Sequence, residues 1–199
     1  METSKKTLLQ TYTGDFRVAV ADIIKELMLE MEKEYGWTFT EEELANTPTR
    51  VASFYEEWAN NQKYSKMTTF IPEYSVDEMI VVSGTRFASL CSHHLLPFFG
   101  TIDVVYLPRE KIFGLSKIPR LILKKASQPQ TQEKLTQDIA DFIEKELQPR
   151  AVLVVSHAVH TCMAIRGVKQ PNAETTVSVA LGEFRTNVAL KEEALKLLQ

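Results

Sequence analysis

The cysteines and histidines of this chain fall into two short clusters. The chain has two cysteines and four histidines in 199 residues. The first cluster lies in CSHHLLPFFG and the second in HAVHTC, and their members are Cys91, His93, His94, His157, His160 and Cys162. Thiolate and imidazole are the ligands that zinc prefers in proteins. Six such side chains gathered at two places therefore indicate a metal site.

The spacing favours Cys91, His94 and Cys162 as the metal ligands. Alternate residues of a strand face the same side, so His160 and Cys162 would share a face, and Arg166 would join them if the strand continued. A turn after the first strand would bring Cys91 and His94 to the same centre. Two thiolates and one imidazole leave a fourth position for water, as catalytic zinc sites do.

Of the three remaining histidines, His93 and His160 would then be available for proton transfer, whereas His157 would point to the other side of the strand. A closed structural site built on three or four cysteines is excluded, because the chain has only two.

Other interpretations of these residues stay open. A single buried cysteine, or a single histidine on a strand, is typical of an ordinary core, and only the joint clustering favours a site. The same geometry would permit a disulfide between Cys91 and Cys162 in the absence of metal, and a nucleophilic cysteine with a histidine partner would use the same residues. A zinc deaminase is disfavoured, because the H-x-E and P-C-x-x-C elements are absent.

Two predicted helix starts carry residues suited to a nucleotide. GLSKIPR places Ser116 and Lys117 at the start of one helix, with Arg120 one turn in. Free N–H groups and a partial positive charge at a helix N-terminus suit a phosphate, although Ser and Lys there also serve as an ordinary cap. The next helix opens with Gln132 and Glu133, which would support the helix itself or accept hydrogen bonds from a guanine edge.

The N-terminal third of the chain is predicted to be helical. An apolar stripe over residues 15–36 predicts an amphipathic helix that ends at Tyr35 and Gly36. A second helix is expected after Thr40, which forms a capping-box pattern with Glu43, and Pro48 is expected to break it in two. We assign residues 1–65 to an N-terminal helical extension and residues 66–199 to one catalytic domain.

After Pro72 the pattern changes to short strands rich in β-branched and aromatic residues. Two helices are expected at about 117–126 and 130–148, and a last helix at the C-terminus. Strands are expected at 75–84, 85–91, 100–108, 111–116, 151–167 and 175–184. Strands in runs and helices in runs predict an α+β fold, with a largely antiparallel sheet and helices packed on one face.

Composition excludes several classes of function. The net charge of −3 offers no basic field for a nucleic-acid backbone, so no nucleic-acid partner is expected. The longest apolar runs fall short of the ~18 residues that a membrane span needs, and no membrane partner is expected. With two cysteines and no apolar leader, we expect a cytoplasmic protein.

With these residues in place, the chain resembles GTP cyclohydrolase I over about residues 40–185. The resemblance is carried by motifs that appear in the same order: NTPTRVASFY, LCSHHLLPFFG, VVYLPREKIFGLSKIPR, QPQTQEKLT, HAVHTCMAIRGV and TTVS. It implies the tunnelling fold, GTP as substrate, and assembly as a decamer of two stacked pentamers with active sites at subunit interfaces.

The resemblance also implies a role for each matching residue. Zinc would be held by Cys91, His94 and Cys162, and a zinc-activated water would attack C8 of the guanine ring. Protons would be handled by His93 and His160. The ring would open, C8 would leave as formate, and the product would be 7,8-dihydroneopterin triphosphate. Guanine would be bound by Gln132 and Glu133. Ribose and triphosphate would be bound by Ser116, Lys117, Arg120, Arg166 and Arg50. Ser116 would also be catalytic.

The chain departs from the family pattern at a few positions. Ser92 stands where the family usually has Glu, Ser127 and Gln128 stand near a usual arginine, and Ser53 stands where lysine is common. Fewer basic residues would weaken triphosphate binding or favour a less charged nucleotide. These departures motivate a second hypothesis, a catalytically impaired or substrate-shifted homologue that binds a purine or pterin as a regulatory or assembly partner.

Overall fold

The computed structural model describes residues 14–60, 67–73 and 76–199. The chain forms two compact units, Met1–Asn60 and Asn61–Gln199. The boundary expected between residues 65 and 66 falls outside the described residues, so that domain division stays a prediction. No helix in the described part of the chain is long and apolar enough to cross a membrane.

The first unit is a pair of packed helices, α2 (Phe16–Tyr35) and α3 (Glu41–Asn60). Helix α2 ends at Gly36, whose φ of 66° is the left-handed conformation that favours glycine. The predicted capping box before α3 is present, because Thr40 Oγ1 accepts from the Glu43 N–H and the Glu43 carboxylate accepts from the Thr40 N–H. The expected break at Pro48 is wrong. Helix α3 is continuous, since this cap and the packing against α2 offset the one backbone hydrogen bond that proline removes.

The second unit is built on a five-stranded sheet with the order β5-β2-β3-β6-β7. All neighbouring strands are antiparallel except β2 and β5, which form a short parallel pair. The strands are β2 (Ile80–Cys91), β3 (Pro97–Leu107), β5 (Pro129–Gln130), β6 (Ala151–His160) and β7 (Glu174–Gly182). A separate two-stranded sheet pairs β1 (Thr69–Phe70) with β4 (Ile112–Phe113).

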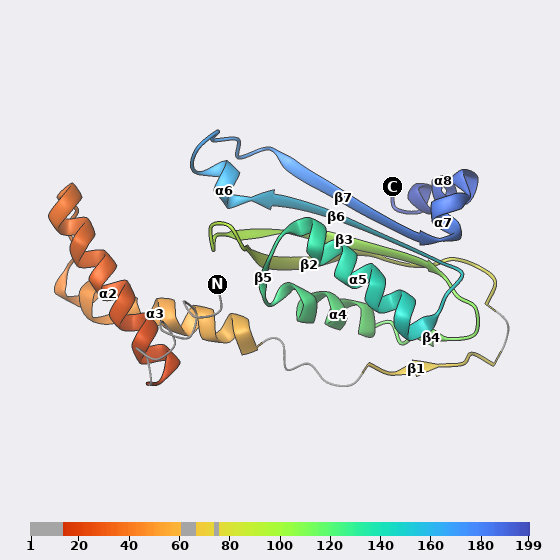
Figure 1. The fold of residues 1–199 in the computed structure, drawn as a ribbon, viewed down its shortest axis with the longest axis horizontal. Helices are drawn as coiled ribbons and strands as arrows, with labels where there is room; N and C mark the ends of the chain where they lie inside the picture. The colour runs from red at the N-terminus through yellow and green to blue at the C-terminus, as the bar shows by residue number, and fades with distance from the viewer. Residues whose placement is uncertain (1–13, 61–66, 74–75) are drawn as a thin grey trace, which may run out of the picture. The chain divides into compact units, whose positions relative to one another are not determined.

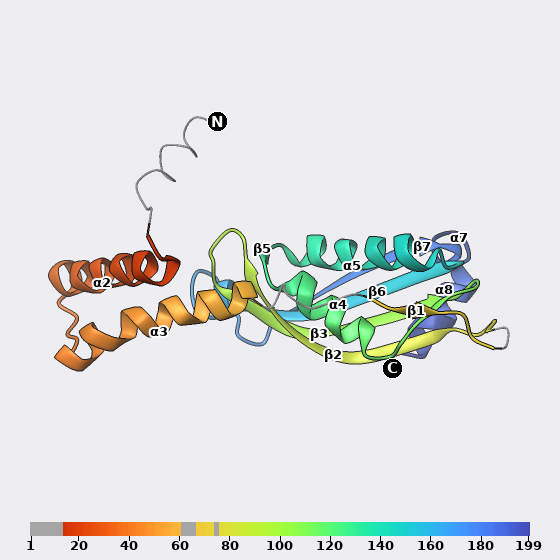
Figure 2. The same cartoon turned by 90° about the horizontal axis from the view of Figure 1, so that it is seen from below.

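Two helices of the second unit, α4 (Lys117–Ala126) and α5 (Gln132–Leu147), cover one face of the sheet (Figures 1 and 2). Their apolar stripes pack on the alternate strand residues that face them, such as Val104 and Val154. The neighbouring residues Val105 and Leu153 face the other way and form a smaller core with α7 (Glu183–Thr186) and α8 (Val188–Lys196). The predicted α+β class with an antiparallel sheet is confirmed.

The strands expected at 75–84 and 85–91 are not separate, because β2 runs without a break from Ile80 to Cys91 with a bulge between Val82 and Thr85. The first expected strand therefore starts too early, and its residue 75 lies outside the described residues. Gly84 has a φ of 65°, and its N–H donates to Asp103 Oδ1 on β3 at 2.6 Å. The glycine therefore marks a bulge that a buried carboxylate fixes, and the strand continues through it.

Strand β6 ends at His160, and a helical turn, α6 (Thr161–Ala164), follows, so the strand expected over 151–167 is too long. The sheet register explains the end. Because Phe98 pairs with His160, the next rung would join Pro97 to Thr161, and proline has no N–H to donate. Thr161 instead donates its hydroxyl to the Pro97 carbonyl at 2.6 Å.

Gly100 on β3 lies so close to the backbone of β6 that a larger side chain there would clash. A Cβ at Gly100 would lie 1.9 Å from the carbonyl oxygen of His157, whereas a Cβ at Gly114 would meet only Lys117 Cγ, at 3.8 Å. We expect Gly100→Ala to lower the free energy of unfolding by at least about 1–3 kcal/mol, the usual cost of overpacking. Urea midpoints measure this effect, with Gly114→Ala as the matched control. Equal midpoints for the two variants would contradict the predicted clash.

Candidate functional site

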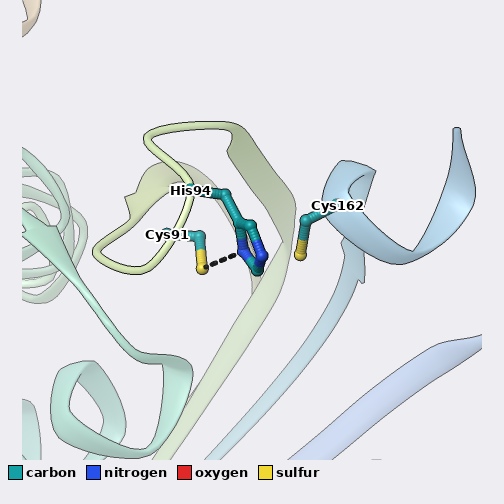
Figure 3. Close-up of side chains that lie close together, drawn as sticks. All are labelled: Cys91, His94 and Cys162. Carbon is teal, nitrogen blue, oxygen red and sulfur yellow. Dashed lines mark hydrogen bonds between the residues drawn. The ribbon is translucent and has the colours of Figure 1, made fainter. Parts of the chain in front are cut away.

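The structure brings together Cys91, His94 and Cys162, whose ligand atoms all lie within 4.8 Å of one another (Figure 3). Cys91 is the last residue of β2 and is buried, and its Sγ lies 3.7 Å from His94 Nδ1. Cys162 is carried by α6 and is half-buried. The three side chains converge although β3, α4, α5 and β6 lie between Cys91 and Cys162 in the sequence.

A tight turn brings His94 back toward Cys91. The carbonyl of Cys91 accepts from the N–H groups of His94, at 3.3 Å, and Leu95, at 2.8 Å, and the Cys91 N–H donates to the Leu96 carbonyl at 2.8 Å. Leu95 takes a φ of 54°, which reverses the chain ahead of β3. The turn expected between the first cysteine and β3 is therefore present.

Cys162 reaches the centre from a helical turn, whereas the sequence suggested that it lies on a strand. Burial raises the pKa of the Cys162 thiol, the neighbouring Cys91 raises it further, and Arg166 opposes the shift. Arg166 lies beyond α6, exposed. The strand argument that put His160, Cys162 and Arg166 on one face is wrong, because β6 ends at His160.

The donor set fits a soft divalent ion. Zinc holds thiolate at about 2.3 Å and imidazole at about 2.0–2.1 Å, so sulfur and nitrogen ligands of a tetrahedral site lie about 3.6 Å apart. The 3.7 Å between Cys91 Sγ and His94 Nδ1 matches that separation without movement. Three protein ligands leave one position of a tetrahedral ion for water or substrate.

His160 lies at the end of β6 beside this cluster. Its ring stacks on Phe98, with centroids 4.7 Å apart and an interplanar angle of 1°. Burial lowers the pKa of His160, and the carboxylate of Glu133 opposes that shift, which places Glu133 within electrostatic reach. His93 is exposed on the turn, and its Nδ1 lies 4.0 Å from Cys91 Sγ.

Gln132 is buried, with 1% of its surface exposed, while Glu133 beside it is exposed. Gln132 Nε2 donates to the carbonyls of Ser156 and Thr175, and its Oε1 lies 2.8 Å from His160 Nε2. Sequence reasoning missed these partners, and it also missed Phe98. The one available signal was a serine, Ser156, within the otherwise apolar run of β6.

The three residues at the start of α4 are not brought to the Cys-His-Cys cluster within one chain. Ser116, Lys117 and Arg120 lie at the N-terminal end of α4, whereas its last residue, Ala126, accepts from Ser89 Oγ at 2.7 Å, two positions before Cys91. A ten-residue helix is about 15 Å long. Figure 1 likewise shows β4 and the start of α4 at the end of the sheet opposite α6.

The surroundings of Ser116 and Arg50 bear on their predicted roles. The hydroxyl of Ser116 makes no capping hydrogen bond to α4, so it does not serve the helix. Arg50 lies on α3 in the first unit and forms an ion pair with Glu42 at 3.0 Å.

Comparison with known proteins agrees with these features. Residues 21–199 match the sequence profile of GTP cyclohydrolase I. The chain is 48% identical to GTP cyclohydrolase 1 of Sulfurihydrogenibium sp. over 79% of this chain and 83% of the relative. It is 45% identical to GTP cyclohydrolase 1 of Aquifex aeolicus over 79% of this chain and 85% of the relative.

Among solved structures, the chain is similar to an archaeosine synthase QueF-Like protein in the apo form. The TM-score is 0.43 and the identity 17%, with 55% of this chain and 97% of that chain covered, a likeness too low to inform function. The sequence matches are far stronger, and they span the sheet, the helices α4 and α5, and the Cys-His-Cys cluster. The fold described above is consistent with the tunnelling fold of that family. The chain therefore belongs to the GTP cyclohydrolase I family.

Proposed function

We propose that this protein is a zinc-dependent GTP cyclohydrolase I that converts GTP and water to 7,8-dihydroneopterin triphosphate and formate. The observation that carries the proposal is the convergence of Cys91, His94 and Cys162 beside His160 and Glu133, in a chain of this family. Zinc bound by the three ligands would supply a water whose pKa is lowered toward ~7, a nucleophile for C8 at neutral pH.

The protein's own residues would orient the base and move the protons. The exposed carboxylate of Glu133 would accept hydrogen bonds from the N–H edge of guanine and so fix where C8 lies. His160 would accept the proton that the attacking water loses and return it to the ring nitrogen that leaves. His93, exposed on the same turn as His94, would serve the later proton transfers.

The triphosphate would be held at the start of α4. The free hydroxyl of Ser116, the ammonium of Lys117 and the guanidinium of Arg120 would meet phosphate oxygens at a helix N-terminus. Because these residues lie a helix length from the cluster of the same chain, we propose that they complete the site of a neighbouring copy. Arg166, beside Cys162, would add a cation from the cluster side, and Arg50 would assist. The same sharing supports a homo-oligomer, proposed as a decamer of two pentamers in the cytoplasm.

The departures from the family pattern motivate the second candidate, an impaired or substrate-shifted homologue. Ser92 is exposed, and its N–H donates to the Gln130 carbonyl at 3.2 Å, so no carboxylate stands between Cys91 and the two histidines. Ser127 is buried and its hydroxyl donates to the Lys124 carbonyl at 2.7 Å, which makes this position part of the end of α4. Turnover of GTP separates the two candidates.

The first prediction from the proposed function concerns the reaction itself. Zinc-loaded wild-type protein incubated with GTP should release formate and, after mild oxidation, a fluorescent pterin in equal amounts. Formate is measured enzymatically and the pterin by chromatography. GDP and guanosine serve as competing substrates that reveal a shift toward a less charged nucleotide. Absence of product from folded, zinc-loaded protein would contradict the proposed enzyme activity and favour the impaired homologue.

The second prediction separates metal binding from proton transfer. Cys162→Ala should lose zinc and activity together, since it removes one of three ligands. His160→Ala should keep zinc and lose about 10²–10⁴-fold in turnover, the usual contribution of a general acid or base. Zinc per chain is measured by atomic emission. The matched control is Met163→Ala, an exposed neighbour, which should keep both. Full turnover by His160→Ala would refute its assigned role.

The third prediction tests the shared site by mixing two inactive variants. Cys162→Ala lacks the cluster, and Lys117→Ala lacks the phosphate contact. After unfolding and refolding together in equal amounts, about a quarter of the interfacial sites should hold both wild-type halves and regain activity. Each variant refolded alone is the control, and mass spectrometry of the oligomers verifies mixing. Mixed oligomers no more active than the separate variants would show that one chain supplies the whole site.

A further inference from the structure

Gln132 contacts His160 from the protein interior, at the start of α5, and the residue after it, Glu133, is the exposed one. We propose that Gln132 is a positioning residue that holds the His160 ring with its proton on Nε2 and so leaves Nδ1 as the proton-accepting atom. The inference rests on the proposed function only where it gives His160 a role in proton transfer.

The orientation of the Gln132 amide follows from its surroundings. Nε2 lies 3.1 Å from the carbonyl oxygen of Ser156 and 2.9 Å from that of Thr175. Carbonyl oxygens only accept hydrogen bonds, so the amide nitrogen must face them. The reversed amide would set Oε1 against two carbonyl oxygens and lose the hydrogen bonds that Nε2 donates to them.

The orientation of the amide then determines the tautomer of His160. Oε1 of Gln132 lies 2.8 Å from His160 Nε2, and an amide oxygen can only accept. The imidazole must therefore donate from Nε2, and whenever the ring carries a single proton Nδ1 has the free lone pair. Nδ1 makes no hydrogen bond to any residue in the described part of the chain.

A buried network holds Gln132 in this position. Ser156 Oγ lies 3.0 Å from Gln132 Nε2 and 2.7 Å from Thr136 Oγ1, and Thr136 Oγ1 donates to the Gln132 carbonyl at 2.8 Å. Gln132, Thr136 and Ser156 are each at most 1% exposed. The imidazole is thus restrained in its plane by Gln132 and across its plane by the stacked ring of Phe98.

The same contacts argue against a direct grip of guanine by the Gln132 side chain. Both polar atoms of its amide are engaged, and its surface is 1% exposed. Turning the amide toward a ligand would break its hydrogen bonds to the carbonyls of Ser156 and Thr175. The exposed carboxylate of Glu133 is left as the contact for the guanine edge.

The kinetic test uses Gln132→Met, which keeps the length of the side chain and removes the acceptor. We expect kcat to fall at least about tenfold, toward the ~10²–10⁴-fold that complete loss of proton transfer costs, with the Kd for GTP changed less than about threefold. Glu133→Gln is the matched neighbour and should raise the Kd for GTP. In a His160→Ala background, Gln132→Met should cost no further turnover, because both changes remove one function.

The spectroscopic test reads the tautomer directly in zinc-loaded protein labelled with ¹⁵N-histidine. The His160 signals are assigned by their loss in His160→Ala. We expect a protonated-type shift for Nε2 and an unprotonated-type shift for Nδ1 in wild type, and loss of that preference in Gln132→Met. A purely structural role for Gln132 would alter zinc content or the unfolding midpoint of the variant and leave this preference unchanged.

Two results would overturn the proposal. One is an Nδ1-protonated His160 in wild type, and the other is a Gln132→Met variant with normal kcat and a raised Kd for GTP. If Gln132→Met does not fold, the wild-type tautomer decides. If wild type turns over no GTP, the proposed function fails while the tautomer measurement still tests this inference.

Discussion

The Cys91, His94 and Cys162 cluster forms where the backbone hydrogen bonding between β3 and β6 ends. Pro97 has no N–H, so pairing stops after His160, and Thr161 binds the Pro97 carbonyl through its hydroxyl as the chain turns into α6. That turn takes Cys162 toward Cys91 at the end of β2. A strand that continued would have carried Cys162 along the sheet, so the missing N–H of Pro97 is a condition for the convergence of the three side chains.

The identity of the candidate ligands could be predicted from sequence, and their placement only in part. Thiolate and imidazole are rare here and gathered at two places, so residue type gives six candidates, and spacing reduces them to Cys91, His94 and Cys162. The end of β6 could not be read locally, because it is caused by a proline on the neighbouring strand. The helices α2, α4 and α5 follow local periodicity and were predicted well. The continuous helix through Pro48 was not, since tertiary packing outweighs that local signal.

Gln132 shows a second limit of sequence reasoning. An amide in the first turn of a helix can serve the helix, a ligand or the core, and sequence gives no basis for choosing. Its role depends on two carbonyls, of Ser156 and Thr175, that converge only because β6 and β7 pair beneath α5. An amide with these partners has one satisfactory orientation, and that orientation turns Gln132 Oε1 toward His160 Nε2.

The residues proposed to bind phosphate and the Cys-His-Cys cluster lie at opposite ends of one helix, α4. Helix α4 packs on the sheet along its length, with Ile118, Leu121 and Ile122 buried. A nucleotide bound at one end of α4 therefore cannot reach the other end through the core. A chain could offer its cluster to one nucleotide and its Ser116 end to another. In that case assembly would be a requirement of the chemistry and more than a source of stability, because an isolated chain would hold the base and the reacting water without the contacts that fix the triphosphate.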